Sequence, residues 1–278
     1  MHLPNQVVWH GNWPCLCPEP TSERVFFGVS AMLFAASTTA AILWCGSMSA
    51  MDGMSMPGGW TMSMAWMRMP GQTWAAATIS FLGMWIVMTV AMMLPSLVPM
   101  LLRYRRSAGR IGAARLGWLT LLVGAGYFIV WTVFGLAVFP LGAALAAIEM
   151  RVATLASAVP FAVGVVVLIS GAIQFTAWKA YHLACCRETS LWGRPLNSDP
   201  GTAWRHGLRL GLQCIYCCAN LMLIPLVIGV MDLRAMAAAT AAITLERLGP
   251  GAERVARVIG VVIVGGGLFL IAQAAALI

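Results

Sequence analysis

The sequence has few charged residues. Of its 278 residues, 17 are Lys or Arg and nine are Asp or Glu, so that only 9% carry a charge. An ordinary soluble domain is about a quarter charged, and so few charges could not cover a water-soluble globule of this size. The shortage excludes a soluble enzyme, a disordered chain and a secreted disulfide scaffold.

Several familiar signals are also missing. Residues 1–24 are polar and rich in proline, and the first apolar run ends at Trp44-Cys45 without a small-residue cleavage site, so we expect no cleavable signal peptide. The sequence contains no nucleotide-binding motif, so we expect no nucleotide partner. The net charge of +8 is spread over short segments between apolar runs and not over one hydrated face, so we expect no nucleic-acid partner.

Hydrophobic residues dominate instead. They make up 60% of the chain, and the mean hydropathy is +0.84. A bilayer core of about 30 Å requires roughly 20 apolar residues per helix. The sequence therefore predicts an all-α fold, a polytopic transmembrane helix bundle of about six spans in a lipid bilayer. The runs that meet the length requirement are 25–46, 74–102, 116–139, 152–178, 207–230 and 254–276.

Basic residues predict the orientation of these spans. Arginines are concentrated in 103–115, and Lys and Arg recur through 179–209. By the positive-inside rule both segments should face the cytoplasm. Residues 1–24 would then form a cytoplasmic tail, residues 25–278 a single transmembrane domain, and both termini would be cytoplasmic.

The segments expected outside are 47–73, 140–151 and 231–253. Residues 231–248 are too polar at both ends to span the bilayer. We expect a short helix there at the outer surface, packed on the bundle or lying in the interface.

Sulfur is abundant, with 19 Met and eight Cys. The external loop 47–73 is methionine-rich and contains Met51, Met54 and Met56. Thioethers are neutral soft ligands that suit Cu(I), and they cannot be locked into disulfides. The loop is therefore a candidate copper contact. Alternatively, its Met and Trp residues form an apolar plug at the membrane surface.

Methionines also follow one face of the second apolar run. Met84, Met88 and Met92 are spaced four residues apart and share a helix face. Pro95 and Pro99 loosen the backbone toward the inner end of this run. The stripe is either a ligand row or a packing face.

Thiols are concentrated in the fifth apolar run. Cys214, Cys217 and Cys218 fall on one side of a helix, and Met222 follows one turn later. This pattern favours metal or redox chemistry, while a buried cysteine can also be a small packing residue.

The two sulfur rows could meet if their helices are neighbours. With a rise of about 1.5 Å per residue, Met84 would lie level with Cys217, and Met88 level with Cys214. A mixed thiolate and thioether site would favour Cu(I) over Zn(II), because the spans offer no His, Asp or Glu.

A third thiol group is expected at the inner surface. His182, Cys185 and Cys186 follow the fourth apolar run. They could form a thiolate relay, or the pair could be a palmitoylation-like or merely tolerated pair of thiols. Thioethers outside and thiols inside form a gradient of rising Cu(I) affinity, which suits uptake or sequestration.

The sulfur motifs also carry a family resemblance. The chain resembles a bacterial family of predicted metal-binding integral membrane proteins, a domain of unknown function, roughly over residues 75–255. The stretches that carry it are Met84-Trp85 through Pro95, Gln174 through Arg187, and Gly211 through Cys218 and Met222 to Glu246-Arg247.

The resemblance implies a multi-pass protein of the bacterial inner membrane and draws attention to further residues. Met231 and Asp232 could receive an ion from the external loop. Glu246 and Arg247 could instead cap and anchor a surface helix.

Three functions remain open at this stage. The first is a protein that handles Cu(I), by uptake, sequestration or delivery to a membrane metalloenzyme, through Met and Cys ligands. The second is a non-catalytic accessory subunit of a larger membrane complex. The third is a membrane thiol oxidoreductase that uses a vicinal cysteine pair, for which no acid or His is expected beside the thiols. An enzyme is thus not the favoured interpretation.

Overall fold

The computed structural model describes residues 20–49, 53–57, 59–69, 71–108, 111–188 and 199–276. Helices account for nearly all of them, and the predicted all-α class is confirmed. A short hairpin, β1 (Met54–Ser55) with β2 (Thr61–Met62), and a 3-10 turn, η1 (Met64–Trp66), separate the first two helices. The helices are α1 (Pro20–Ser49), α2 (Trp74–Ser107), α3 (Ala113–Glu149), α4 (Ala153–Ile173), α5 (Ala177–Glu188), α6 (Pro200–Ile228), α7 (Leu233–Leu248) and α8 (Ala252–Ala276).

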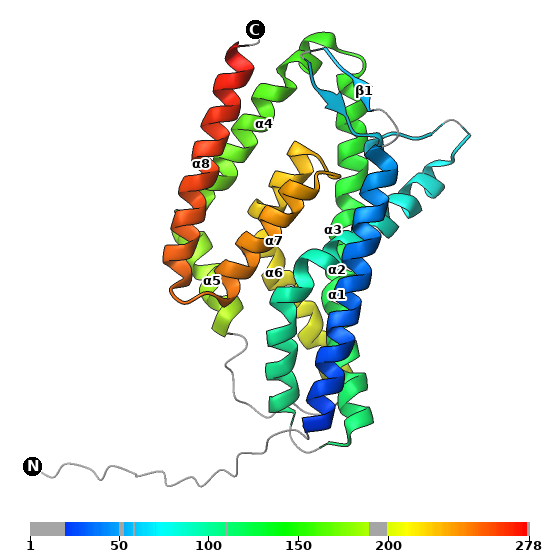
Figure 1. Cartoon of the computed structure of the whole chain (residues 1–278), viewed down its shortest axis with the longest axis vertical. Helices are drawn as coiled ribbons and strands as arrows, with labels where there is room; N and C mark the ends of the chain where they lie inside the picture. The colour runs from blue at the N-terminus through cyan, green and yellow to red at the C-terminus, as the bar shows by residue number, and fades with distance from the viewer. Residues whose placement is uncertain are drawn as a thin grey trace, which may run out of the picture.

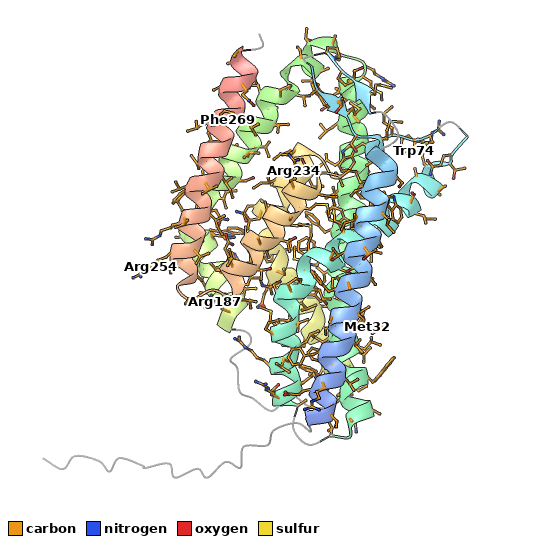
Figure 2. All side chains as sticks on the ribbon, viewed as in Figure 1. Met32, Trp74, Arg187, Arg234, Arg254 and Phe269 are labelled. Atoms are coloured by element: carbon orange, nitrogen blue, oxygen red, sulfur yellow. The ribbon has the colours of Figure 1, made fainter. Side chains whose placement is uncertain are left out.

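Six of the described helices, α1 to α4, α6 and α8, are long and apolar enough to cross a membrane, and they correspond to the six predicted runs. Large apolar side chains point outward from the bundle, among them Met32 on α1 and Phe269 on α8 (Figure 2), which are 74% and 62% exposed. Exposed apolar side chains in this number suit a lipid environment better than water.

The helices form two groups with α7 between them (Figure 1). One group contains α1, α2, α3 and α6, and the other pairs α4 with α8. α7 packs against α2, α6 and α8, and α5 packs against α6 and α7 near the lower end. The main core lies where α2, α3, α6 and α7 meet, and this is where the sulfur-bearing segments come together.

Glycines allow the closest helix contacts. A Cβ added at Gly211 of α6 would lie 2.9 Å from the Tyr127 carbonyl oxygen of α3, and one at Gly267 of α8 would lie 2.7 Å from the Leu168 amide nitrogen of α4. Both are shorter than any normal contact, so a larger residue would push the helices apart. Small residues of this kind let membrane helices approach closely, and Gly211 fixes α6 against the stretch of α3 that carries Tyr127.

The helix expected at 231–248 is present as α7, and it runs along the bundle (Figure 1). Asp232 caps it, accepting hydrogen bonds from the amides of Arg234 and Ala235. Because α7 returns toward the lower end, α8 runs upward and ends opposite the start of α1. The sequence placed both termini on the cytoplasmic side of a membrane, and that orientation stays a prediction.

α2 is bent where it passes behind α1 and turns along the bundle (Figure 1). Pro95 and Pro99 lie inside this helix, and a proline there removes a backbone hydrogen bond and kinks the chain. The bend directs the methionines of the first half of α2 and those of the second half toward different parts of the core.

Candidate metal centre

Four buried thiols lie together at the contact between α5 and α6. Cys214, Cys217 and Cys218 project from one side of α6, and Cys186 comes from α5; none is more than 1% exposed. The Sγ atoms of Cys214 and Cys218 are 3.8 Å apart, Cys217 hydrogen-bonds with Cys218, and Cys186 hydrogen-bonds with Cys217. That last hydrogen bond, together with burial, raises the pKa of the Cys186 thiol. We call these residues the thiol cluster.

Cys214 is the member of the cluster that receives hydrogen bonds from outside it. The Tyr127 hydroxyl of α3 donates to its Sγ at 3.0 Å, and the Arg247 guanidinium of α7 donates at 3.3 Å. The Met93 thioether of α2 lies 3.9 Å away. Two donors aimed at one sulfur, one of them cationic, stabilise negative charge on it, and the thiolate is the form of cysteine that binds metals.

The Arg247 guanidinium is buried beside this sulfur, with 3% of the residue exposed. Its remaining contacts are the Ser96 hydroxyl at 2.9 Å and the Met100 thioether at 2.8 Å. Arg247 takes part in none of the ion pairs found among the described residues. A buried cation without an anion is costly, so the sulfur of Cys214 is the atom placed to supply the compensating charge.

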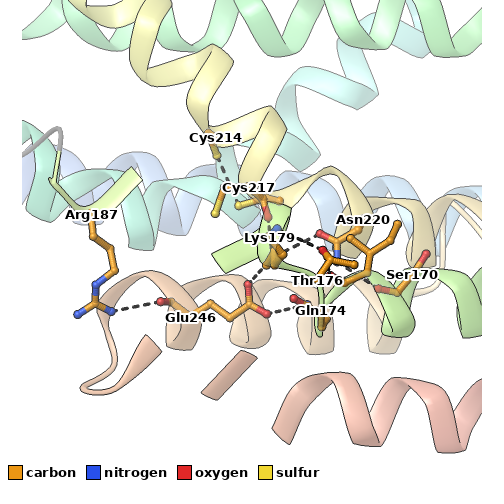
Figure 3. A network of polar contacts seen from close by, with 11 residues as sticks. Ser170, Gln174, Thr176, Lys179, Arg187, Cys214, Cys217, Asn220 and Glu246 are labelled. Carbon is orange, nitrogen blue, oxygen red and sulfur yellow. Dashed lines mark hydrogen bonds and ion pairs between the residues drawn. The ribbon is translucent and has the colours of Figure 1, made fainter. Parts of the chain in front are cut away.

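A second cation of the interior is fully paired (Figure 3). Lys179 Nζ of α5 lies 2.7 Å from Glu246 Oε2 of α7 and donates to the Cys217 carbonyl oxygen at 2.6 Å. The Gln174 amide donates to Glu246 Oε1 at 2.7 Å. Burial raises the pKa of the Glu246 carboxyl, and Lys179 opposes that shift. The network ties α5, α6 and α7 together around the backbone of Cys217.

These charged residues correct the sequence interpretation. The sequence suggested no acid beside the thiols, counted Lys179 among the cytoplasmic cations, and gave Glu246 and Arg247 as possible anchors of a surface helix. The structure buries all three, with Lys179 and Glu246 at 0% exposure. Hydropathy could not show this, because a charge at the end of an apolar run is usually solvated, and only the packing of α5 and α7 onto α6 brings these side chains inward.

The register between α2 and α6 also differs from the expected one. Cys214 lies opposite Met93 and not opposite Met88. The expected register assumed two straight, antiparallel helices, whereas α2 is bent. Met92 and Met222 are buried in the same core, at 2% and 0% exposure.

Met84 and Met88 line a different space, nearer the start of α2. They border a void of about 10 Å³ together with Cys45 and Met236. Met231 borders it as well, and the Cys45 thiol donates to its sulfur at 3.8 Å. The sequence pattern indicated Met231 but not Cys45, because Cys45 near the end of α1 has no other cysteine close to it in the sequence.

Cys185 and His182 point away from the thiol cluster. Cys185 is half-buried and hydrogen-bonds with Tyr181. The His182 ring stacks on Tyr216, with 5.2 Å between ring centroids. Adjacent residues on a helix point about 100° apart, so Cys185 and Cys186 serve different surroundings and do not face each other as a pair.

Among the remaining predicted ligands, Asp232 is the cap of α7 and Met54 lies exposed on β1. Met56 follows that strand and is half-buried. Met51 lies outside the described residues.

Over the ranges that the structure describes, no three His, Cys, Asp or Glu side chains are gathered into a ready metal site. The thiols form a hydrogen-bonded row with thioethers alongside. Such a donor set fits Cu(I), which favours soft sulfur and accepts low coordination numbers, better than it fits tetrahedral Zn(II).

A family model described as a copper chaperone, PpoB2, matches residues 82–270, which is more than half of the chain. The chain belongs to the PpoB2 copper chaperone family. Comparisons with curated proteins and with solved structures gave no match. The match to the copper chaperone family covers the thiol cluster, Tyr127, Arg247 and the Lys179–Glu246 pair, and it starts beyond the hairpin and η1.

Proposed function

We propose that the chain is a membrane-embedded Cu(I) chaperone that carries its cargo at the thiol cluster. The observation that carries this proposal is the Arg247 guanidinium, buried and directed at the sulfur of Cys214 at 3.3 Å. Membership of a copper chaperone family supports copper as the cargo.

Charge explains why an arginine belongs at this position. A Cu(I) ion held by two thiolates has one net negative charge, and such an anion is costly in an apolar interior unless a cation lies beside it. Among the described residues Arg247 is paired with no carboxylate, whereas Lys179 is already neutralised by Glu246. The bound copper with its two thiolates would thus balance the charge of the buried Arg247 guanidinium. Loss of the copper would leave that positive charge to be balanced in another way.

The charge argument separates Cu(I) from divalent ions. Zn(II) with the same two thiolates would be neutral and would leave Arg247 unbalanced. A closed tetrahedral Zn(II) site would also need Cys217 and Cys186 as thiolates. Four thiolates around Zn(II) would carry two net negative charges, which the single Arg247 guanidinium would not balance, while Lys179 is already paired with Glu246. The cluster therefore favours a monovalent soft ion.

Cys214 with Cys218 is the pair that we assign to the ion, and Cys217 and Cys186 continue the row toward α5. A chain of neighbouring thiols lets an ion pass from one sulfur to the next by ligand exchange. We infer that the chain lies in the bacterial inner membrane and that a membrane metalloenzyme accepts the copper ion from it.

The test is the copper content of the full chain, purified in detergent under reducing, copper-replete conditions. We expect about one tightly held copper per chain in the wild type, and its loss in C214S/C217S/C218S. C185S is the matched control, because Cys185 is a thiol of the same region that points toward Tyr181. Metal-free wild-type protein with intact thiols, or equal loss in C185S, would contradict the proposal.

A further inference from the structure

A cavity lined by thioethers lies at the upper end of the bundle, apart from the thiol cluster. Its volume is about 320 Å³. Six methionines from four segments line it, namely Met48 of α1, Met64, Met67 and Met69 in and after η1, Met84 of α2 and Met231 before α7. We call it the methionine cavity.

The geometry points to a second soft-metal site in the methionine cavity, one that takes up Cu(I) before it reaches the thiol cluster. Thioethers are neutral and soft, and they select Cu(I) over hard or divalent ions. Among the residues that the structure describes, the lining contains no carboxylate or imidazole, and Gln72 and Ser80 are its polar side chains. The chemistry of the walls therefore suits a monovalent soft ion.

Packing does not explain this arrangement. Methionine is adaptable and fills irregular gaps in protein cores. Here the six side chains border open space that exceeds the volume of one water molecule, about 30 Å³, many times over. Methionines that only filled a gap would have closed it.

Shared methionines link the cavity to a candidate route toward the thiols. Met84 and Met231 border both the methionine cavity and the small void below it, where the Cys45 thiol lies 3.8 Å from the Met231 sulfur. From Met84, α2 continues through Met88 to Met93, which lies 3.9 Å from Cys214. These nine residues cover about 14 Å at 1.5 Å per residue.

The role of this site as the entry to the thiol cluster rests on the proposed function. Binding of an ion in the methionine cavity is independent of the proposed function, because the residues that line the cavity are different from those of the thiol cluster. A thioether site holds Cu(I) more weakly than thiolates do, so an ion captured there would be drawn onward.

The experiment uses Ag(I), a redox-stable ion of the same charge and softness, with the full chain in detergent. In C214S/C217S/C218S protein we expect Ag(I) to bind in the cavity, and the further change M64L/M67L/M69L to weaken that binding at least tenfold. Leucine preserves the volume and apolar character of these positions. The remaining cysteines are the same in both proteins and cancel in the comparison.

The control is M32L/M54L/M150L in the same background, because these methionines are exposed at 74%, 42% and 46% and do not line the cavity. With its cysteines intact, M64L/M67L/M69L should keep its copper at the thiol cluster and load at least tenfold more slowly, which also shows that it is folded. Equal Ag(I) binding with and without the leucines would overturn the inference, as would a cavity that holds only a detergent or lipid chain in both proteins.

Failure of one site is distinguishable from failure of the other. Wild-type protein without copper at the thiols, but with an Ag(I) response that depends on Met64, Met67 and Met69, would refute the proposed function and support the cavity site. Copper bound at the thiol cluster, together with Ag(I) binding that does not depend on these methionines, would support the proposed function and refute the cavity site.

Discussion

The thiol cluster and the methionine cavity are both rich in sulfur, yet they differ in almost every other property. The thiols are fully buried, carry Arg247 and the Lys179–Glu246 pair beside them, and are hydrogen-bonded to one another. The methionine cavity has a volume of about 320 Å³, and the described residues that line it include six methionines and no charged side chain. The first arrangement suits holding an ion, and the second suits capturing and releasing one.

On the proposal that both regions bind Cu(I), charge accounts for the difference between them. A neutral thioether binds Cu(I) and leaves a cation, which is tolerated near a surface. A pair of thiolates leaves an anion, which requires a compensating cation in the interior. Arginine is suited to that role because it cannot lose its proton in proteins.

The largest expected effect comes from separating the paired charges next to the thiols. E246Q leaves the buried Lys179 ammonium without a carboxylate, and breaking a buried pair in this way costs about 3–5 kcal/mol of stability. Thermal unfolding in detergent should show this loss. The double variant K179M/E246L, which removes both charges, should recover most of it. Equal losses in the single and double variants would show that the pair does not hold α5 against α7.

R247M tests the charge compensation itself. Methionine has a similar length but no charge, so we expect Cu(I) affinity at the thiol cluster to fall about 100-fold, which corresponds to about 2.8 kcal/mol. R247K should retain more affinity than R247M. The measurement is competition with a Cu(I) chelator, and in the C214S/C217S/C218S background R247M should leave Ag(I) binding in the methionine cavity unchanged. Unaltered copper affinity in R247M would remove the electrostatic part of the account.

Acid should affect the two regions differently. Cu(I) displaces protons from thiols but not from thioethers, so lower pH opposes binding at the thiol cluster only. For each proton displaced, we expect apparent affinity to fall roughly tenfold per pH unit below neutrality. Chelator competition at several pH values checks this in wild-type protein. Ag(I) binding in C214S/C217S/C218S should have a shallower pH dependence, and parallel profiles would contradict the comparison.

The smallest effect separates the two vicinal cysteines. C186S removes a thiol that hydrogen-bonds with Cys217, and we expect copper affinity to fall about tenfold, or about 1.4 kcal/mol. C185S should leave affinity within a factor of about two. The same chelator competition checks both. A larger loss in C185S would place the copper route on the other side of α5.

Much of the architecture follows from simple sequence patterns. The scarcity of charge and six long apolar runs predicted the membrane bundle, and the spacing of Cys214, Cys217 and Cys218 predicted one thiol-bearing face of α6. Both are local properties, because helix periodicity decides which side chains share a face.

The partners of those thiols could not be predicted in the same way. Tyr127 and Arg247 reach Cys214 only through the close packing of α3 and α7 on α6, and Met93 does so through the bend of α2. The sequence offered two signals of these partners. One was a single Tyr in an apolar run, and the other was an acidic residue next to an Arg in a short helix. Their meaning depends on tertiary contacts between residues far apart in the sequence.

The methionine cavity was anticipated in part. The methionine-rich loop was a candidate copper contact, but the residues assigned to it were Met51, Met54 and Met56. The cavity is lined instead by Met48, Met64, Met67 and Met69 with Met84 and Met231. Composition predicted a methionine-rich region here, and only the fold of the hairpin and η1 over α1 and α2 selects the side chains that line the cavity; copper contact stays a prediction.

The most direct test of the account is X-ray absorption at the copper edge, on copper-loaded wild-type protein and on C214S/C217S/C218S. The account predicts that Cu(I) in the wild-type protein is coordinated by sulfur atoms alone. It also predicts that the variant loses the tightly held copper. Copper bound through nitrogen or oxygen, or a sulfur shell that survives in the variant, would contradict the assignment of the thiol cluster as the copper carrier.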